Sequence, residues 1–156
     1  MPNEEQQYCL HLIDEAATLA FGAKIATTLH AGLIIFLKGD LGAGKTALTR
    51  GILRGMGYQG KVKSPTYNLV EIYNFSRLYL YHFDFYRFND YSEWEAAGFR
   101  DYFNSETICL VEWPEKGGDL LPTADLTIKL QFANRGRFAR IRANTTQGKK
   151  CLALLA

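Results

Sequence analysis

Eight consecutive residues, 39–46, read Gly39-Asp40-Leu41-Gly42-Ala43-Gly44-Lys45-Thr46, which has the G-x-x-x-x-G-K-T spacing of a phosphate-binding loop. Glycine has no Cβ atom, so the backbone of such a loop can wrap closely around a phosphate chain. The amide hydrogens then point inward and form a nest for an anion. We therefore predict that residues 39–46 bind the phosphates of a nucleotide.

Two side chains at the end of the loop carry its chemistry. Lys45 is expected to lie against the β- and γ-phosphates as a mobile point charge, in an exposed loop with phosphate as its partner. The Thr46 hydroxyl is expected to take one coordination position of Mg²⁺. The helix that follows would turn the positive end of its dipole toward the same phosphates.

The segments on either side of the loop support this prediction. A continuous apolar run, 33–37, precedes it and is typical of a strand buried on both faces. After it, Leu48, Ile52 and Met56 recur every four residues and form an apolar helical stripe. Strand, glycine loop and helix is the arrangement that the motif requires, which argues against a chance match.

Composition limits the class of protein. The 156 residues fit a single domain, 1–156, and 47% of them are hydrophobic, which is enough for a core. The formal charge of +2 gives no large basic field that would indicate nucleic acid as the main ligand. The three cysteines, Cys9, Cys109 and Cys151, are far apart and indicate neither a disulfide framework nor a zinc site. With a polar, acidic N-terminus and no apolar run of membrane-spanning length, a cytoplasmic protein is expected.

The rest of the chain alternates between helical and strand-like patterns. In chain order we expect a helix capped by Asp14 and running to about Leu29, a hairpin of 67–73 and 78–84, a helix opened by a capping box at 92–95 and running through Phe103, a strand at 107–112, a hairpin of 126–132 and 138–142, and an edge strand at 149–156. These elements predict an α/β protein with a P-loop NTPase fold, a three-layer sandwich. Its mixed sheet would be largely parallel at the centre, with antiparallel hairpins at the edges.

Two strand-like segments end in a carboxylate that could serve a nucleotide-bound metal. Residues 108–112 are four apolar residues followed by Glu112, and residues 80–84 end in Asp84. Hydrolysis of a nucleotide needs an acid near Mg²⁺ and a group that orients the attacking oxygen. Either acid could instead cap a helix or pair with a surface arginine. The phosphate-binding loop favours the functional interpretation for both.

Several neighbouring residues allow two interpretations. His82 shares a strand face with Asp84, although a lone histidine is more often structural. Trp113 is expected either beside the nucleotide or in the core. The aromatic run 79–91 could be a docking surface for a partner or could fill the core.

Four motifs together resemble one family of proteins. Gly-Asp-Leu-Gly-Ala-Gly-Lys-Thr at 39–46, Ser-Pro-Thr-Tyr at 64–67, His-x-Asp-x-Tyr-Arg at 82–87 and Glu-Trp-Pro-Glu at 112–115 follow one another at suitable spacing. They are similar to the motifs of the TsaE family, also called YjeE. The resemblance covers nearly the whole chain, and the four motifs are specific only in combination.

The resemblance implies a function. TsaE-like proteins are small, Mg²⁺-dependent ATPases with weak activity alone, and they act with the TsaB and TsaD proteins. That complex places a threonylcarbamoyl group on adenosine 37 of tRNAs that read codons beginning with A. This protein would therefore contact tRNA only indirectly, through the complex. No membrane is expected to be involved. The ATPase is needed for the cycle rather than for the transfer chemistry.

The resemblance also implies roles for single residues. By motif, Thr46 and Glu112 would bind Mg²⁺, and Asp84 would support catalysis together with Lys45 and Glu112. The expected contacts to ATP beyond residues 39–46 are, listed together, Thr66 in a switch-like loop, Trp113, Arg137 and, on the adenine side, residues 14–18.

A small-molecule kinase remains the main alternative. Such kinases also carry a phosphate-binding loop, but they close an arginine-rich lid over their substrate. The arginines at 135, 137, 140 and 142 alternate as in an edge strand rather than a lid. A GTPase is disfavoured because the sequence has no N-K-x-D motif for guanine.

Overall fold

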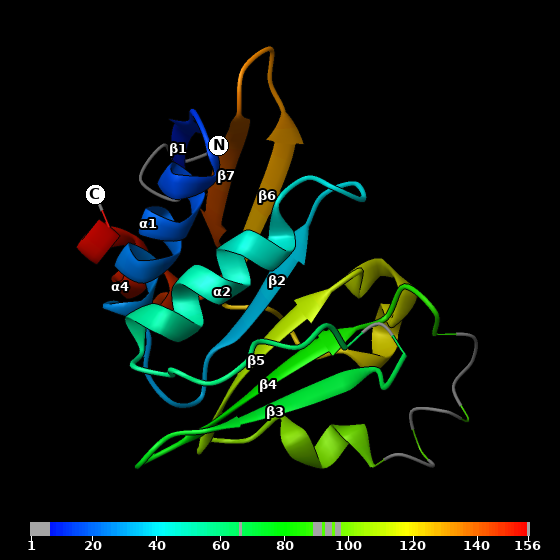
Figure 1. The fold of residues 1–156 in the computed structure, drawn as a ribbon. Coiled ribbons are helices and arrows are strands. Elements are labelled where there is room, and N and C mark those ends of the chain that lie inside the picture. The colour runs from blue at the N-terminus through cyan, green and yellow to red at the C-terminus, as the bar shows by residue number, and fades with distance from the viewer. Residues whose placement is uncertain (1–6, 66, 89–91, 93–94, 96–97, 156) are drawn as a thin grey trace.

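A mixed sheet of seven strands runs through the protein, as the computed structural model shows for residues 7–65, 67–88, 92, 95 and 98–155 (Figure 1). The strands lie side by side in the order β1-β7-β6-β2-β5-β4-β3. Their bounds are β1 Gln7–Leu12, β2 Ile34–Lys38, β3 Val70–Asn74, β4 Tyr79–Asp84, β5 Thr107–Glu112, β6 Leu126–Phe132 and β7 Arg137–Ala143.

The four central strands β6, β2, β5 and β4 pair in parallel. At the two edges the pairing is antiparallel, between β3 and β4 and along β6, β7 and β1. The mixed sheet with a parallel centre and antiparallel edge hairpins is therefore confirmed. Parallel strands end at the same sheet edge, so β2, β4 and β5 bring residues 38, 84 and 112 to one side of the molecule.

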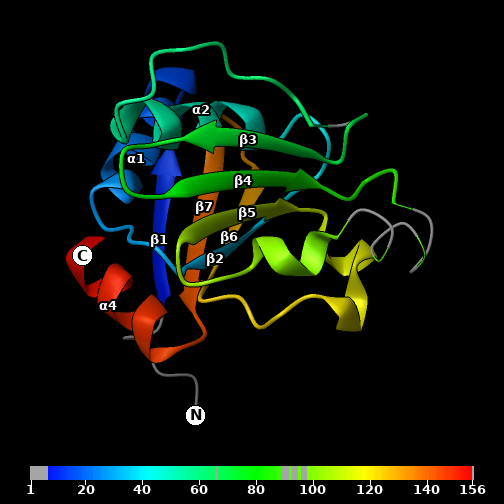
Figure 2. The ribbon, with the colours of Figure 1, turned by 90° about the horizontal axis from the view of Figure 1, so that it is seen from below.

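Helices α1 (Glu15–Ala26) and α2 (Lys45–Gly55) lie together on one face of the sheet (Figures 1 and 2). The Asp14 carboxylate accepts a hydrogen bond from the backbone N–H of Ala17 at 2.8 Å, which confirms Asp14 as the N-cap of α1. The helix ends at Ala26, slightly earlier than expected. The 3-10 helix η2 (Phe99–Tyr102) lies on the opposite side of the sheet, beneath β4 and β5 (Figure 2).

The two helices cross at glycine, with their backbones in direct contact. A Cβ atom added to Gly51 would lie 2.4 Å from the carbonyl oxygen of Leu19, and one added to Gly22 would lie 2.6 Å from that of Leu48. These distances are far below van der Waals contact, so a larger residue would push the helices apart. The crossing therefore places α1 and α2 closer together than side chains would allow.

Two terminal segments differ from the sequence expectation. The C-terminal residues form a helix, α4 (Thr146–Leu155), so the predicted edge strand at 149–156 is wrong. Its buried positions, listed together, are Gly148, Cys151, Leu152 and Leu155, and this spacing is that of one helical face. At the other end, β1 was not expected; it pairs with β7. Of the helix expected over 92–103, residues 93, 94, 96 and 97 lie outside the described residues; Ser92 and Glu95 are helical, and Phe99–Tyr102 form a 3-10 helix instead of continuing an α-helix.

The aromatic run 79–88 fills a second core on the η2 side of the sheet. Phe83, Phe85 and Phe88 are buried there, and Tyr79 and Tyr86 are partly exposed. The core interpretation therefore holds for these three phenylalanines, and residues 89–91 lie outside the described part. Two short 3-10 helices, η3 (Pro114–Lys116) and η4 (Gly118–Leu120), follow β5. Among the described residues, no helix has the length and apolar character needed to cross a membrane.

Candidate active site

The glycine loop connects the end of β2 to the start of α2, as the sequence predicted. Gly44 caps α2 with a φ of +103°, a conformation that residues with a Cβ atom rarely adopt. At Gly39 an added Cβ would lie 2.8 Å from the carbonyl oxygen of Leu130. Glycine is thus required at both positions, once for conformation and once for space.

Arg137 of β7 restrains this loop from outside. Its Nε donates to the carbonyl oxygen of Ala43 at 3.2 Å, and Nη2 donates to that of Gly42 at 3.0 Å. The guanidinium also lies over the Phe132 ring, 4.6 Å from its centre. Two consecutive loop carbonyls are therefore held by one rigid, planar group, and Arg137 itself lines the pocket.

Lys45 is buried, contrary to the expectation of an exposed lysine with phosphate as its sole partner. Its side chain is 6% exposed, and Nζ donates to the carbonyl oxygen of Gly39 at 2.7 Å. Nζ also lies 3.9 Å from Oε1 of Glu112 and 4.2 Å from the centre of the Trp113 ring. An ammonium group removed from water needs such partners, because burying an unpaired charge is costly.

Asp84 and Glu112 end neighbouring parallel strands and are register partners. Both are nearly buried, and both line the same pocket as Lys45. Burial raises the pKa of Asp84 above its ordinary value. The hydrogen bond from the Tyr86 N–H at 2.9 Å and the nearby charges of His82 and Lys45 oppose that rise in pKa, whereas the charge of Glu112 adds to it.

His82 is one of the residues whose role the sequence left undecided. Its Nε2 lies 2.6 Å from Oε2 of Glu112, so the imidazole holds one carboxylate oxygen while the other faces Lys45. The ring is 2% exposed, and Nδ1 has no hydrogen-bond partner among the described residues. The alternation that placed His82 and Asp84 on one strand face was visible in the sequence, but the contact to Glu112 depends on the β4–β5 register.

Trp113 follows β5 directly and has a left-handed backbone, with a φ of +55°. For a bulky residue this conformation costs roughly 1–3 kcal/mol and persists only where the surroundings impose it. The indole lies over the Lys45 ammonium and packs against the Tyr86 ring, with centroids 5.0 Å apart. The strained turn therefore directs the tryptophan back over the site.

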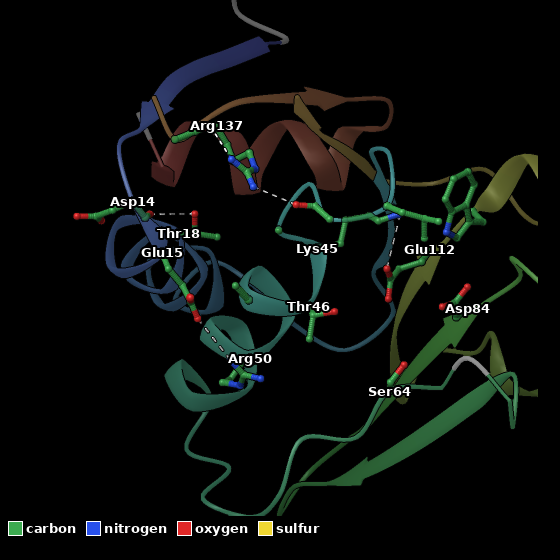
Figure 3. A pocket seen from close by; sticks show the side chains of 16 residues that line it. Asp14, Glu15, Thr18, Lys45, Thr46, Arg50, Ser64, Asp84, Glu112 and Arg137 are labelled. Atoms are coloured by element: carbon green, nitrogen blue, oxygen red, sulfur yellow. Dashed lines mark hydrogen bonds and ion pairs between the residues drawn. The ribbon is translucent and has the colours of Figure 1, made fainter. Parts of the chain in front are cut away.

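These groups surround one pocket of about 470 Å³ (Figure 3). Lys45, Thr46, Asp84 and Glu112 lie on one side of it, and the start of α1 forms the other side with residues 14, 15 and 18. Arg50 of α2 lies between them, 3.8 Å from Glu15. The volume is within the usual range for a small-molecule site.

Some of the other predicted site residues line this pocket, and others do not. Leu41, Gly42 and Gly44 line it, and Ser64 reaches it from the loop after α2. Gly39 and Asp40 instead line a second hollow on the far side of the glycine loop. Ala43 is buried, and Thr66 lies outside the described residues.

The donor set is suited to magnesium. The hydroxyl of Thr46 and the carboxylates of Asp84 and Glu112 are hard oxygen ligands on one pocket wall. Within the described part of the chain, no cluster of three or more His, Cys, Asp or Glu side chains forms a complete metal site. Mg²⁺ normally keeps several waters and shares nucleotide phosphates, so a partial set of protein ligands is what it requires.

Comparison with known proteins adds an independent observation. Residues 12–140 match the family model described as "Threonylcarbamoyl adenosine biosynthesis protein TsaE". The chain is 47% identical over 148 residues to a Haemophilus influenzae protein named "tRNA threonylcarbamoyladenosine biosynthesis protein TsaE", covering 92% of this chain and 94% of that one. It is 38% identical over 121 residues to a Bacillus subtilis protein of the same name, covering 78% and 75%. The crystal structure of B. subtilis YdiB superposes with a TM-score of 0.82 at 29% identity, covering 96% of this chain and 93% of that one.

Proposed function

This chain belongs to the TsaE family, and from that premise we propose that it binds and hydrolyses ATP in the biosynthesis of threonylcarbamoyladenosine in tRNA. One observation carries the proposal: Lys45 and Thr46 of the glycine loop share a pocket with the strand-end acids Asp84 and Glu112. A phosphate-binding loop alone binds a nucleotide, whereas hydrolysis also needs acids at this position.

Each group of residues in the pocket has its own proposed role in ATP hydrolysis. The amides of the glycine loop and the dipole of α2 bind the phosphate chain. Lys45 leaves its contact with Gly39 and neutralises charge on the transferred phosphate. Thr46 and Glu112 would hold Mg²⁺, and Asp84 would orient the attacking water. The pocket wall around residues 14–18 of α1 contacts the adenine.

Mg²⁺ held by these residues would supply positive charge that stabilises the negative charge developing on the phosphates during hydrolysis. His82 orients Glu112 by donating to Oε2. The other carboxylate oxygen, Oε1, faces Lys45 and could turn toward the metal side of the pocket once Lys45 moves to the phosphates.

We expect slow hydrolysis in isolation because of the contacts that Lys45 makes. Lys45 is held by Gly39, Glu112 and the Trp113 ring, so these contacts must be exchanged for phosphate contacts. We expect a partner to favour that exchange, or to supply a missing charge in trans, as arginine fingers do for other phosphate-loop proteins. The proposed partners are the TsaB and TsaD proteins in the cytoplasm. This protein would contact tRNA only through its complex with them.

The test is an ATPase assay on the purified protein with Mg²⁺, with and without purified TsaB and TsaD. Slow phosphate release alone, a several-fold rise with both partners, and threonylcarbamoyladenosine in added tRNA are expected. Lys45→Ala is the matched control for contaminating ATPase. Full activity in isolation that the partners leave unchanged, with no modified tRNA, would contradict the proposal.

A transfer assay separates this function from that of a small-molecule kinase. Of the clustered arginines on β7, Arg137 lines the pocket, whereas Arg140 and Arg142 are exposed and are not among its lining residues, so the cluster does not resemble the arginine-rich lid of a kinase. With γ-labelled ATP, the label is expected in inorganic phosphate. Label in nucleosides or small acids would favour the kinase.

A further inference from the structure

One face of the sheet, away from α1 and α2, is open along β1, β7 and β6. Exposed and buried residues alternate along β7, where Phe138, Arg140 and Arg142 are exposed and the residues between them are buried. The buried residues pack in the main core. The exposed ones form the outer surface of the sheet.

Three cations lie in a straight row across this face. Lys38 of β2 is the register partner of Lys129 of β6, and Lys129 is the register partner of Arg140 of β7. Register partners point to the same face of a sheet, and neighbouring strands are about 4.8 Å apart. We call residues 38, 129 and 140 the cationic row.

The cationic row works against stability. Like charges placed directly opposite each other destabilise strand pairing. In the described part of the chain, no ion pair at 4.0 Å or less includes any of the three side chains. Strands β1, β2, β6 and β7 contain no Asp or Glu, and Arg142 adds another exposed cation one row away. Such a repulsive row is expected where the charges serve an external partner.

The row lies next to the nucleotide site. Lys38 immediately precedes Gly39 of the glycine loop. Lys38 and Lys129 also line the second hollow, of about 460 Å³, together with the acids Asp40 and Glu115. The third cation, Arg140, lies outside that hollow, on the strand that carries Arg137. A partner bound here would touch the strands that support the phosphate-binding loop.

We infer that the cationic row is a docking surface for an acidic protein surface on the TsaB–TsaD pair, an inference that rests on the proposed function above. Charge complementarity favours an acidic partner. A protein is favoured over RNA because the net charge of the whole chain is only +2. The exposed Phe138 ring on this face packs against the His11 ring, with centroids 5.0 Å apart.

The experiment uses Lys129→Glu in the full chain. This change places a carboxylate between two cations, so thermal stability should be unchanged or higher, and affinity for ATP should be unchanged. Binding to purified TsaB–TsaD at low salt should fall at least tenfold, and the loss should shrink as the salt concentration rises. Lys149→Glu is the matched control: the same charge change, on the exposed side of α4, should leave binding unchanged.

Each outcome of these binding measurements either supports the proposed docking surface or contradicts it. Equal binding of Lys129→Glu and Lys149→Glu overturns the docking surface but leaves the proposed function intact. Failure of the unchanged protein to bind TsaB–TsaD overturns both. A bare tRNA transcript is titrated in parallel; if Lys129→Glu loses binding to tRNA but keeps binding to TsaB–TsaD, the occupant is RNA and the inference is wrong.

Discussion

Asp84 and Glu112 lie directly opposite each other at the ends of adjacent parallel strands. Both are nearly buried, yet their neighbours differ. Glu112 is bound by His82 and faces Lys45, whereas Asp84 accepts a hydrogen bond from the Tyr86 backbone. Two carboxylates side by side in different surroundings are expected to have different roles.

The first prediction separates the two acids. Glu112→Gln should weaken the Mg²⁺-dependent part of nucleotide affinity, because a metal ligand is lost. Asp84→Asn should lower turnover about 100-fold or more, as loss of a group that orients or activates water does, with nucleotide binding largely kept. Titration with a fluorescent ATP analogue, with and without Mg²⁺, and single-turnover rates measure both. If Asp84→Asn alone removed the Mg²⁺ dependence, the roles would have to be exchanged.

The second prediction concerns stability and pH. Burial raises the pKa of Asp84 above its ordinary value of 3.8, so the folded state binds this proton more tightly than the unfolded state. The ionised acid therefore costs stability above that pKa, and the cost disappears as the pH falls toward 4. Asp84→Asn should thus raise the melting temperature at pH 7. The difference from the unchanged protein should shrink in acid, and a lower melting temperature at pH 7 would show that the charge stabilises the fold.

The third prediction concerns Lys45. Lys45→Ala should abolish hydrolysis, since charge stabilisation in such sites is worth on the order of several kcal/mol. The lysine is buried beside Glu112, so we also expect a modest fall in melting temperature. Lys45→Met fills the space without the charge and should be inactive but more stable than Lys45→Ala. Hydrolysis near the normal rate by either folded variant would refute the assignment of the site.

The fourth prediction tests His82 as a positioning residue for Glu112. His82→Phe keeps a ring but removes the donor, whereas His82→Gln keeps an N–H near the position of Nε2. His82→Phe should therefore weaken nucleotide affinity with Mg²⁺ and leave affinity without Mg²⁺ unchanged, and His82→Gln should restore part of the loss. Equal behaviour of the two variants would indicate a purely structural histidine.

The fifth prediction concerns the helix crossing. Gly51→Ala should destabilise the fold by about 1–3 kcal/mol, the usual cost of overpacking, because the added methyl group meets the Leu19 backbone. Urea denaturation measures the change. Arg50→Ala, at the neighbouring position, removes only a partly exposed ion pair and should cost less than about 1 kcal/mol. Similar losses for both would mean that the crossing tolerates a methyl group.

The sequence predicted those parts of the structure that depend on neighbouring residues. The glycine loop, the strands ending at Asp84 and Glu112, and the cap at Asp14 are local patterns, and all are present. The prediction that Lys45 is exposed was wrong. The residues that bury it, Trp113 and Glu112, are distant from it in the sequence.

Distant pairing also explains the other errors. Strand β1 exists because Gln7–Leu12 pairs with β7 at the opposite end of the chain, and a short polar–apolar run does not reveal its partner. Helix α4 stands where an edge strand was expected, and its Gly148 packs closely against Asp125, where an added Cβ would lie within 3 Å of the backbone.

The glycine crossing of α1 and α2 has a mechanical consequence. The two helices are in direct backbone contact, with no side chain between them at the crossing. A movement of α2 would therefore move α1 with it. The two sides of the pocket, at Lys45 and at the start of α1, would then keep a fixed separation. Since α1 follows β1 directly, the exchange of contacts at Lys45 would displace the outermost strand of the sheet, far from the phosphates that started the motion.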